Sequence, residues 1–245
     1  MGIKRGSITT SIVADGLVLN MDAANRVSTI PDTNTTKTFN TVNTAVSGTL
    51  SSTGMFDSST VTPSLAYGGT DNVIGSRNYP NEILGDADRT ISIWCKTNSN
   101  TSTTYFPYQL GNTDSSFSPT RSKFAPLVNS GGAQHLRIYR MNADSSTLDW
   151  SSTFPDVYIT DGNWHNLVVD YSNLTSNIYV DGQLLGQCTF SDALQTQVGF
   201  NIGRWAQAGG FWVGNLNNFL IYNRVLSTSE VLHNYNALKG RFGLS

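Results

Sequence analysis

The amino-acid sequence predicts an all-β fold in which two antiparallel sheets pack as a β-sandwich, followed by one short C-terminal helix. Short segments with alternating apolar residues recur along the chain, and Gly, Asn, Asp and Ser residues separate them. The helical crossovers that join parallel strands are missing from the pattern. A length of 245 residues suits one large domain, because such sandwiches often use this length as a single unit.

The clearest part of this pattern runs from Asp161 to Gly186 and predicts a β-meander. A first strand, Trp164 to Tyr171, is followed by a polar connection and a second strand, Asn177 to Val180. Asp181-Gly182 then closes a tight turn before Gln183 starts a third strand. Asp-Gly between alternating apolar residues is a strong hairpin signal, because a type I′ turn needs positive φ at both central residues. The residues expected on one face of the first strand are Leu167, Val169 and Tyr171.

The beginning of the chain is predicted to hold a polar arm, residues 1–15, ahead of one sandwich domain, residues 16–245. Gly16 to Asp22 reads as a strand. Its residues expected on one face are Leu17, Leu19 and Met21. From Arg26 to Pro63 the chain is rich in Thr, Ser and Asn, which we interpret as long excursions. Short edge strands are expected there at Lys37–Val42 and Gly48–Ser51.

Further strands are predicted by alternation and by β-branched and aromatic content. They are expected within Gly85–Lys96, Thr104–Leu110, His135–Met141 and Val198–Arg204. Ile91, Ile93 and Cys95 should share one face. Gly111–Gly132 is interpreted as a loop. Phe211–Tyr222 is interpreted as two strands that separate near Gly214-Asn215.

The C-terminal helix has a clear start signal. Ser227 can accept a hydrogen bond from the backbone of Glu230, and Glu230 can reach back to the amide of Ser227, which makes a capping box. A single apolar stripe follows at i, i+4 and i+7. It consists of Val231, Tyr235 and Leu238. Gly240 is expected to end the helix.

Composition excludes several classes of protein. Charged residues make up 13% of the chain and the formal net charge is -2, so the clustered Lys and Arg of nucleic-acid binders are missing. No segment approaches the roughly 18 apolar residues of a membrane span, and the N-terminus lacks the apolar core of a signal peptide. Cys95 and Cys188 match no metal or redox spacing. Alternation favours a buried free thiol at Cys95, with a disulfide as the open alternative.

The meander also resembles a known family. Its DG-x-WH-x-L-x-V-x-Y and IYVDGQLLG motifs are similar to those of laminin-G-like domains in the concanavalin A-like lectin/glucanase superfamily. The phrases DGLVLNMDAAN, near the start, and RVLSTSEVLHNYNALKGRFGL, near the end, resemble members encoded by tailed phages. The resemblance implies a jelly-roll sandwich, and it implies a virion protein that decorates the capsid or belongs to a tail fibre.

Glycoside hydrolysis is the first activity to test in such a superfamily. Hydrolases of this kind need two carboxylates at a defined separation, and alternate residues of one strand can supply them. Here the glutamates are Glu82, in a turn region, and Glu230, which caps the helix. His165 begins a strand and is expected to form hydrogen bonds there. The motif of serine hydrolases, G-x-S-x-G, is absent. We therefore expect a protein without enzymatic activity and without a catalytic residue.

A structural calcium ion is a further candidate, because relatives with this fold often hold one with carboxylate and carbonyl oxygens, ligands that suit a hard cation. The resemblance places neutral residues, Gly68 and Asn217-Asn218, at two positions that are acidic in the family. The remaining candidate ligands are Asp15, Asp22 and Asp71. Turn formation explains Asp71 equally well. No other cofactor is expected.

Sugar binding would use an exposed aromatic platform with polar neighbours. The candidate residues are Trp205, Arg204, Trp212, Trp150 and Asp149. Trp205 is the first choice, because it lies in a Gly-rich loop outside the alternating strands. The alternative for each aromatic residue is the sandwich core or a protein interface.

Taken together, these observations predict a virion structural protein without enzymatic activity, in the first place a capsid decoration protein with a lectin-like fold. A tail-fibre or receptor-binding component and a free carbohydrate-binding module are the alternatives. The expected partners are other virion proteins, bound through the N-terminal arm, and cell-surface carbohydrate is a further candidate. We expect an oligomer in the assembled virion, no nucleic-acid or membrane partner, and assembly in the host cytoplasm.

Overall fold

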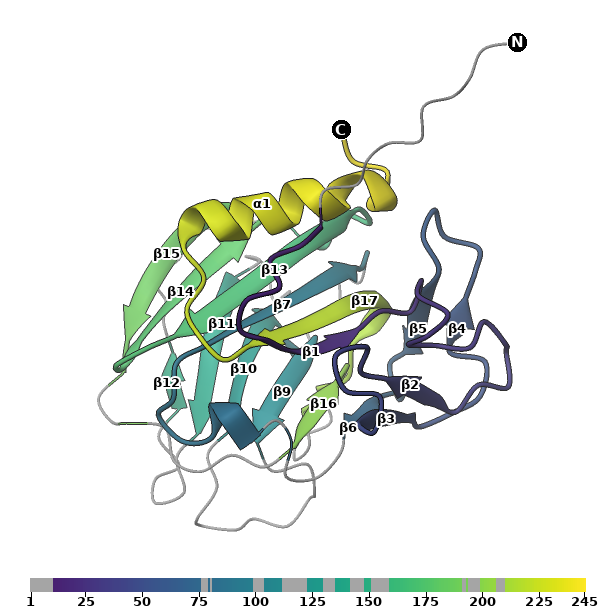
Figure 1. Ribbon diagram of the computed structural model, residues 1–245, viewed down its shortest axis with the longest axis horizontal. Helices are drawn as coiled ribbons and strands as arrows, with labels where there is room; N and C mark the ends of the chain where they lie inside the picture. The colour runs from purple at the N-terminus through teal and green to yellow at the C-terminus, as the bar shows by residue number, and fades with distance from the viewer. Residues whose placement is uncertain are drawn as a thin grey trace.

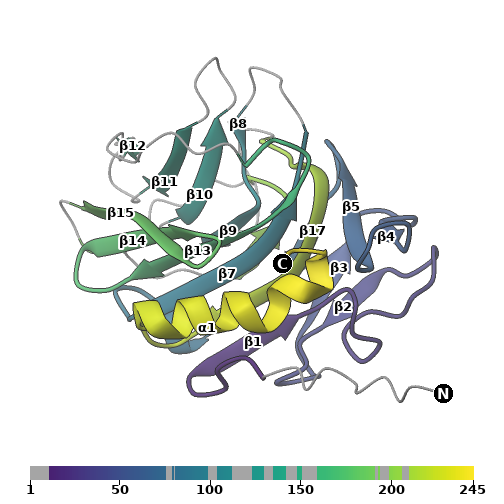
Figure 2. The ribbon, with the colours of Figure 1, turned by 90° about the horizontal axis from the view of Figure 1, so that it is seen from above.

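The computed structural model describes residues 11–75, 79, 81–98, 104–111, 123–129, 135–141, 148–150, 159–190, 193, 199–205 and 210–245. Within these residues two antiparallel sheets, sheet A and sheet B, pack face to face. The helix α1 (Thr228–Leu238) lies along the outer side of sheet A (Figures 1 and 2). The predicted β-sandwich with a C-terminal helix is confirmed.

Among the described residues sheet A contains eight strands. Their order is β15 (Gln183–Thr189), β14 (Thr175–Val180), β13 (Trp164–Tyr171), β7 (Arg89–Lys96), β17 (Val213–Tyr222), β5 (Ser64–Gly68) and β4 (Phe56–Asp57), and β1 (Leu17–Met21) also pairs with β17. β5 pairs with the first half of β17 and β1 with its second half. Segments from both ends of the sequence therefore meet in the middle of sheet A (Figure 2).

Sheet B contains nine strands in the part of the chain that the structure describes. Their order is β12 (Leu148–Trp150), β11 (His135–Met141), β10 (Lys123–Asn129), β9 (Tyr108–Gly111), β16 (Phe200–Ile202), β6 (Val73–Gly75), β3 (Ser47–Leu50) and β2 (Lys37–Phe39), and β8 (Thr104–Tyr105) pairs with β10. A short 3₁₀ helix, η1 (Asn81–Ile83), precedes β7. Both sheets combine hairpins of consecutive strands with pairs that are distant in sequence, such as β7 with β17 and β9 with β16, as in a jelly roll.

The strand β10 corrects the prediction of a loop over Gly111–Gly132. It pairs with β11 along its whole length, with Pro126 opposite Ile138. Proline lacks the amide donor of a sheet and usually argues against an inner strand. Pro126 therefore argued against a strand in the sequence analysis, whereas pairing with β11 holds the strand in place.

The core lies between the inner faces of the two sheets, where the predicted alternation places it. Ile91, Ile93 and Cys95 of β7 are 0% exposed, and Leu167 and Val169 of β13 pack beside them. Each fully buried aliphatic side chain of this kind contributes roughly 1.5–3 kcal/mol to folding. Both cysteines are free and buried, as expected for Cys95.

The strand β1 departs from the predicted alternation at its first residue. Leu19 and Met21 point into the core, but Leu17 packs on the outer side of sheet A. The register with β17 shifts between Leu17 and Leu19, and an extra residue in one strand turns the following side chains to the opposite face. The expectation that Leu17 shares a face with Leu19 and Met21 is therefore wrong.

The segment predicted as two strands is one strand, β17, with its irregularity at Asn217-Asn218 and not at Gly214-Asn215. The register with β7 shifts there, and Asn218 has φ 47°. The Asn217 carboxamide bridges the irregular region. Its Oδ1 accepts from the amides of Ala23 at 2.9 Å and of Asn218 at 2.7 Å, and its Nδ2 donates to the Pro63 carbonyl at 2.8 Å.

The predicted meander is present as β13, β14 and β15. Asp181 and Gly182 have φ 52° and 78°, which fits the type I′ turn expected from Asp-Gly. The polar connection before β14 is a second turn with positive φ at both central residues, Asn173 at 45° and Leu174 at 65°. A branched residue such as Leu174 rarely adopts this conformation, so its sequence gave no sign of the turn.

The helix begins as predicted. Ser227 accepts from the Glu230 amide at 3.3 Å, and the Ser227 amide donates to the Glu230 carboxylate at 2.8 Å. Val231 and Leu238 are buried. Gly240 does not end the helical segment, because a 3₁₀ turn, η2 (Lys239–Phe242), passes through it, and Gly243 follows with φ 77°.

The C-terminal segment covers the outer face of sheet A with aromatic side chains. Phe242 stacks on Trp94 at 4.0 Å between ring centroids and lies 4.9 Å from Trp164. Tyr235 stacks on the same Trp94 ring at 5.7 Å. Trp94 alternates with the inward-facing Ile93 and Cys95 and points away from the core, but it is 0% exposed because the C-terminal residues cover it.

The N-terminal arm has more to bury than its polar sequence indicates. Ile12 and Val13 pack against the residues beneath α1. The Val13 amide donates to Asn234 Oδ1 at 2.8 Å, and His233 Nε2 lies 2.9 Å from the Ser11 carbonyl. Residues 11–15 therefore pack on the folded domain. The preceding ten residues lie outside the described part.

Candidate functional site

The structure buries the aromatic residues that we expected to form an exposed sugar platform. Trp205 is 3% exposed and Trp212 is 0% exposed. Trp205 stacks on Phe106 with ring centroids 4.9 Å apart. The expectation of exposure is wrong for both tryptophans, and the alternative, a place in the packed interior, describes them.

Three of the five predicted residues do lie near one another, at the ends of β16 and β17. The Trp212 amide donates to the carbonyl of Gly203, the residue before Arg204, at 2.9 Å. Arg204 is half-buried, and its guanidinium carbon lies 5.0 Å from the centroid of the Phe211 ring. Arg204 and Phe211 thus form the accessible rim of a buried aromatic cluster.

Trp150 and Asp149 lie in a different part of sheet B. They belong to β12, which is separated from β16 by β11, β10 and β9. Four strand spacings of about 4.8 Å place them roughly 19 Å away. Trp150 pairs with Tyr139 in the backbone register, and the side chains of both predicted residues lie outside the described ones. The predicted five residues therefore do not make one site.

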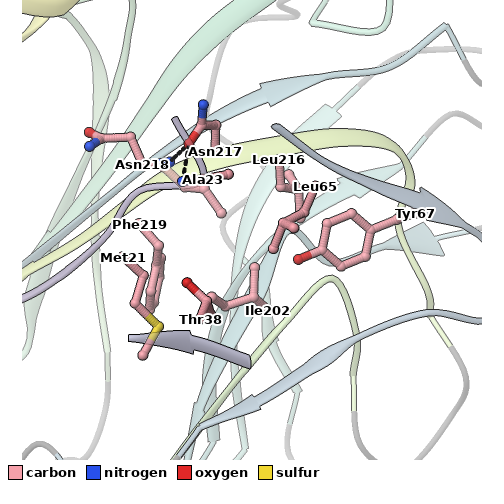
Figure 3. Close-up of a pocket in the computed structure, with 11 residues that line it drawn as sticks. Met21, Ala23, Thr38, Leu65, Tyr67, Ile202, Leu216, Asn217, Asn218 and Phe219 are labelled. Atoms are coloured by element: carbon pink, nitrogen blue, oxygen red, sulfur yellow. Dashed lines mark hydrogen bonds between the residues drawn. The ribbon is translucent and has the colours of Figure 1, made fainter. Parts of the chain in front are cut away.

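A cavity lies inside the sandwich, between the two sheets (Figure 3). Its volume is about 20 Å³, which suffices for a water molecule but is far below the roughly 300 Å³ of a small-molecule site. The Tyr67 hydroxyl points toward it (Figure 3) and has no hydrogen-bond partner among the described residues. Burial raises the pKa of this hydroxyl. The cavity has room for one water molecule and is too small for a sugar.

A surface cleft of about 310 Å³ lies at the edge strand β2, and its volume is in the range of ligand sites. We refer to it as the β2 cleft. Its lining residues come from β2 and from the loop that precedes it. They are Ile30, Asp32, Asn34, Thr35, Thr36, Lys37 and Phe39.

Local hydrogen bonds hold the loop that builds the β2 cleft. Asp32 Oδ1 accepts from the Asn34 amide at 2.8 Å, and the Asp32 carbonyl accepts from the Thr35 amide at 3.0 Å. The Leu50 amide donates to the Thr36 carbonyl at 2.9 Å, which ties the loop to β3. Asp after Pro31 commonly starts such a turn. The cleft is thus a formed feature of the loop.

The β2 cleft presents both apolar and polar groups. Phe39 is half-buried and Ile30 is 58% exposed, so each offers apolar surface. The exposed polar groups are the Asp32 carboxylate, the Asn34 carboxamide and the Lys37 ammonium. Within the described residues, none of these three groups forms an ion pair. Donors and acceptors beside apolar surface match a ligand that carries many hydroxyl groups.

The cleft continues into a row across the outer face of sheet B. Strand register places Lys37 opposite Thr49, Thr49 opposite Ile74, and Ile74 opposite Asn201. Thr49 is exposed, and Asn201 is buried with its Oδ1 lacking a partner in the described part of the structure. The exposed part of the row, from Lys37 to Ile74, spans two strand spacings, roughly 10 Å, which gives an extended ligand room beyond the cleft.

The sequence indicates this site only weakly. Residues 33–36, Thr-Asn-Thr-Thr, lie within the stretch from Arg26 to Pro63 that is rich in Thr, Ser and Asn and that we interpret as long excursions. Polar runs of this kind occur in many surface loops, and the concave shape comes from long-range bonds to β3 and the neighbouring loop. The sequence-based prediction favoured tryptophans such as Trp205 and Trp212 as sugar-binding residues, because a sequence does not show which tryptophans the sandwich buries.

The three calcium candidates lie apart and have protein partners. Asp15 pairs with Arg224 at 2.9 Å, and Asp22 forms two hydrogen bonds with Arg241 at 2.8 and 3.0 Å. Asp71 accepts from Ser52 Oγ at 2.6 Å and from the Gly68 amide at 2.8 Å. Among the described residues, no group of three His, Cys, Asp or Glu side chains gathers as metal ligands.

Asn217 has a structural role at the irregular part of β17. Its Nδ2 donates a hydrogen bond to the Pro63 carbonyl, which a carboxylate could not do. Calcium binding by Asp15, Asp22 and Asp71 stays a prediction.

His165 forms hydrogen bonds at the start of β13, as the sequence predicts. Its Nδ1 lies 2.8 Å from Asp181 Oδ2 and its Nε2 lies 3.1 Å from Asp161 Oδ1. Burial lowers the pKa of His165, but the hydrogen bonds and charges of Asp181 and Asp161 outweigh it, so the pKa lies above its ordinary value. The imidazole joins two turns of the meander and is a structural element.

Comparison with known families agrees with this architecture. The family described as the concanavalin A-like lectin/glucanases superfamily matches residues 68–232, which is more than half of the chain. The chain belongs to this superfamily. No curated protein matches it. Membership confirms the resemblance seen in the meander, and it leaves the resemblance to phage-encoded members as a prediction.

Solved structures with the same fold are distant in sequence. Domain 4 of AbnA, an extracellular arabinanase from Geobacillus stearothermophilus, in complex with arabinotriose, is 15% identical with a TM-score of 0.60, and the match covers 89% of this chain and 98% of that one. A mutant Trypanosoma rangeli sialidase displaying trans-sialidase activity is 15% identical with a TM-score of 0.65, over 96% of this chain and 35% of the sialidase.

The binding domain of Paraclostridial Mosquitocidal Protein 1 is also 15% identical, with a TM-score of 0.61, over 94% of this chain and 55% of that one. Identities at this level establish a shared fold. The chain spans about a third of the sialidase and about half of the mosquitocidal protein's domain structure. In the described part of the chain, no helix has the length and apolar character needed to cross a membrane.

Proposed function

We propose that this protein is a carbohydrate-binding module without catalytic activity and that the β2 cleft is its sugar site. The observation that carries the proposal is the cleft itself, about 310 Å³ in volume, where a carboxylate, a carboxamide and an ammonium group surround apolar surface. Sugars present hydroxyl groups that both donate and accept, beside apolar ring faces, so this set of groups is complementary to them.

The lectin-like fold supports the proposal. Domain 4 of the arabinanase AbnA, which the chain matches over nearly its whole length, was solved with arabinotriose. Linear arabinose oligomers are therefore a reasonable first probe. The exposed row from Lys37 to Ile74 leaves room for more than one sugar unit beyond the cleft.

The absence of catalysis is part of the proposal. Glu230 is paired with Arg224 at 2.7 Å and caps α1, so it has a structural role. Asp161 and Asp181 bind His165. A glycosidase needs two carboxylates on either side of the scissile bond, and the β2 cleft offers Asp32 as its one lining carboxylate.

The test is a glycan array followed by titration calorimetry on each hit, arabinose oligomers included. Lys37→Ala and Asp32→Ala should each weaken binding roughly tenfold or more, because each removes a charge-assisted hydrogen bond worth about 1.5–3 kcal/mol. Val61→Ala, at a side chain 77% exposed beside the C-terminal segment, is the matched control and should bind like the wild type.

Two results would overturn the assignment. An array without hits would contradict carbohydrate binding. If both cleft variants bind the same glycans as tightly as the wild type does, the sugar site lies elsewhere. The half-buried rim of Arg204 and Phe211 is the next place to examine in that case, with Arg204→Ala and Phe211→Ala. Release of reducing sugar from a bound oligosaccharide would contradict the absence of catalysis.

A second candidate function is display on a virion, as a capsid decoration protein or a tail component. The observation that favours it is the resemblance of residues 15–25 and 224–244 to phage-encoded members of the superfamily. Two ion pairs join these segments in the structure: Arg224 binds Asp15, and Arg241 binds Asp22. The resemblance thus covers one structural unit, which packs around the C-terminal helix.

The experiment for virion display is a truncation chosen from the structure. Residues 11–15 pack on the domain, so a deletion should remove residues 1–10 alone. If those residues dock on a virion partner, the truncated protein keeps the wild-type melting temperature but is lost from purified particles. Normal incorporation of the truncated protein would contradict docking through the arm, and absence of the full chain from particles would remove the virion role.

A further inference from the structure

The free edges of the two sheets differ in length. Strand β15 ends sheet A and has seven residues, with β14 as its one neighbour among the described strands. The other strands that end the sheets, β4, β12 and β2, have two or three residues. Strand β1 also borders sheet A, but Asn40 and Thr41 bond to its free side. Among the described strands that end a sheet, β15 is therefore the longest with a single neighbouring strand.

The edges also differ in charge. The strand β15 reads Gln-Leu-Leu-Gly-Gln-Cys-Thr and carries no charged residue. Each of the other end strands carries one charge, at Asp57, Asp149 and Lys37. Charged side chains on an edge prevent pairing with another chain. β15 lacks this protection.

Charge matters most for pairing between identical copies. A two-fold axis between two antiparallel strands places residues near the centre directly beside their own copies. A charged residue there would face a like charge, which is destabilising across a strand pair. The uncharged β15 meets this condition, so a second copy of the chain fits it without repulsion.

Exposed leucines lie at the same edge. Among the described residues, the exposed leucines are Leu184 of β15, at 51%, and Leu232 of α1, at 37%. The two belong to adjoining elements: Gly182, two residues before Leu184, is so close to Leu232 that an added Cβ would lie 3.0 Å from its Cδ1. Exposed apolar residues that gather in one place often mark an interface.

We propose that two copies of this protein pair through β15, antiparallel and about a two-fold axis near Gln187. The register of β14 and β15 shifts at Ile178 and Tyr179, and the strand is regular from Gly186 to Thr189. That regular segment supplies the backbone hydrogen bonds across the axis, and Leu184 and Leu232 of each copy flank it. Sheet A then continues from one copy into the other.

The test compares charge variants at one exposed position. Sedimentation analysis of the wild type over a range of concentrations should show a dimer. Gln187→Lys and Gln187→Glu should each weaken the dimer roughly two- to fivefold, because the variant side chain meets the like charge of its own copy within about 5 Å across the axis. An equimolar mixture of the two variants should restore dimers, since each strand pair then carries opposite charges.

The control is Val61→Lys, which adds a charge at a residue 77% exposed near the C-terminal segment and should remain dimeric. Thermal melting of every variant shows that it is folded. A monomeric wild type at all concentrations overturns the proposal. Dimers that persist in both Gln187 variants, or a mixture that fails to restore them, assign the interface to another surface and overturn it as well.

Discussion

Removing the Phe242 side chain tests whether the C-terminal segment stabilises the sandwich. Phe242 is 3% exposed and stacks on Trp94 and Trp164, with centroid distances of 4.0 and 4.9 Å. Replacement of a buried phenylalanine by alanine costs about 3–5 kcal/mol. We take about 3 kcal/mol for Phe242→Ala, because the chain end can move to fill part of the space. For a protein of this size that lowers the melting temperature by about 6–12 °C.

The assay is thermal and urea unfolding, together with tryptophan fluorescence. Trp94 is 0% exposed and Trp164 is 4% exposed, so loosening of the covering segment should shift the native-state emission to longer wavelength. Phe242→Leu keeps most of the side-chain volume and should cost less than about 1.5 kcal/mol. Val61→Ala, at an exposed residue, should be neutral.

The reasoning fails if Phe242→Ala melts with the wild type and keeps its emission maximum. That result would mean that the two tryptophans stay covered without Phe242. If the melting temperature falls but the emission does not change, the loss is one of packing alone and the segment remains in place.

Three further predictions concern polar side chains. The Arg224 hydrogen bond lowers the pKa of Glu230 to about 2, so Glu230→Gln should cost about 1 kcal/mol at pH 7, and urea midpoints should show the difference shrinking as the pH falls through about 2. The pKa of His165 is raised in the folded protein, so its ion pairs stabilise the fold fully at pH values below the unfolded-state pKa of about 6.5 and less as the pH rises through the folded-state pKa. His165→Gln should therefore make the free energy of unfolding less dependent on pH across that window. A folded-state pKa of His165 below 6.5, measured by NMR, would contradict this prediction. Asn217→Asp removes the donor to the Pro63 carbonyl and should cost about 1–3 kcal/mol, whereas an unchanged urea midpoint would show that the amide is dispensable.

Much of the fold could be predicted from the sequence where the signal is local. The Asp181-Gly182 turn, the Ser227 capping box and the inward face of β7 depend on residues a few positions apart, and the structure confirms them. The predictions failed where a distant segment decides the outcome. Leu17 changes face because of its pairing with β17, and β10 exists because β11 pairs with it.

The candidate site shows the same difference between local sequence signals and contacts between distant segments. The sequence predicted a lectin-like family and a polar stretch from Arg26 to Pro63, but for sugar binding it favoured residues such as Trp205 and Trp212. Both tryptophans are large and apolar, so the sandwich buries them. The β2 cleft arises from hydrogen bonds between loops and strands that are separated in sequence.

By itself, the sequence of this protein determined the class of its fold, the position of its meander and the start of its helix. Alternation, turn residues and caps report backbone geometry within a few residues, and these features need nothing more. Only the tertiary structure decided which faces are covered and which edges stay open. Four residues separate β5 from β6, yet the two strands belong to different sheets. The aromatic C-terminal segment covers Trp94 of β7, which lies more than a hundred residues earlier in the sequence. Such choices depend on burial and pairing between distant segments, which no local pattern records.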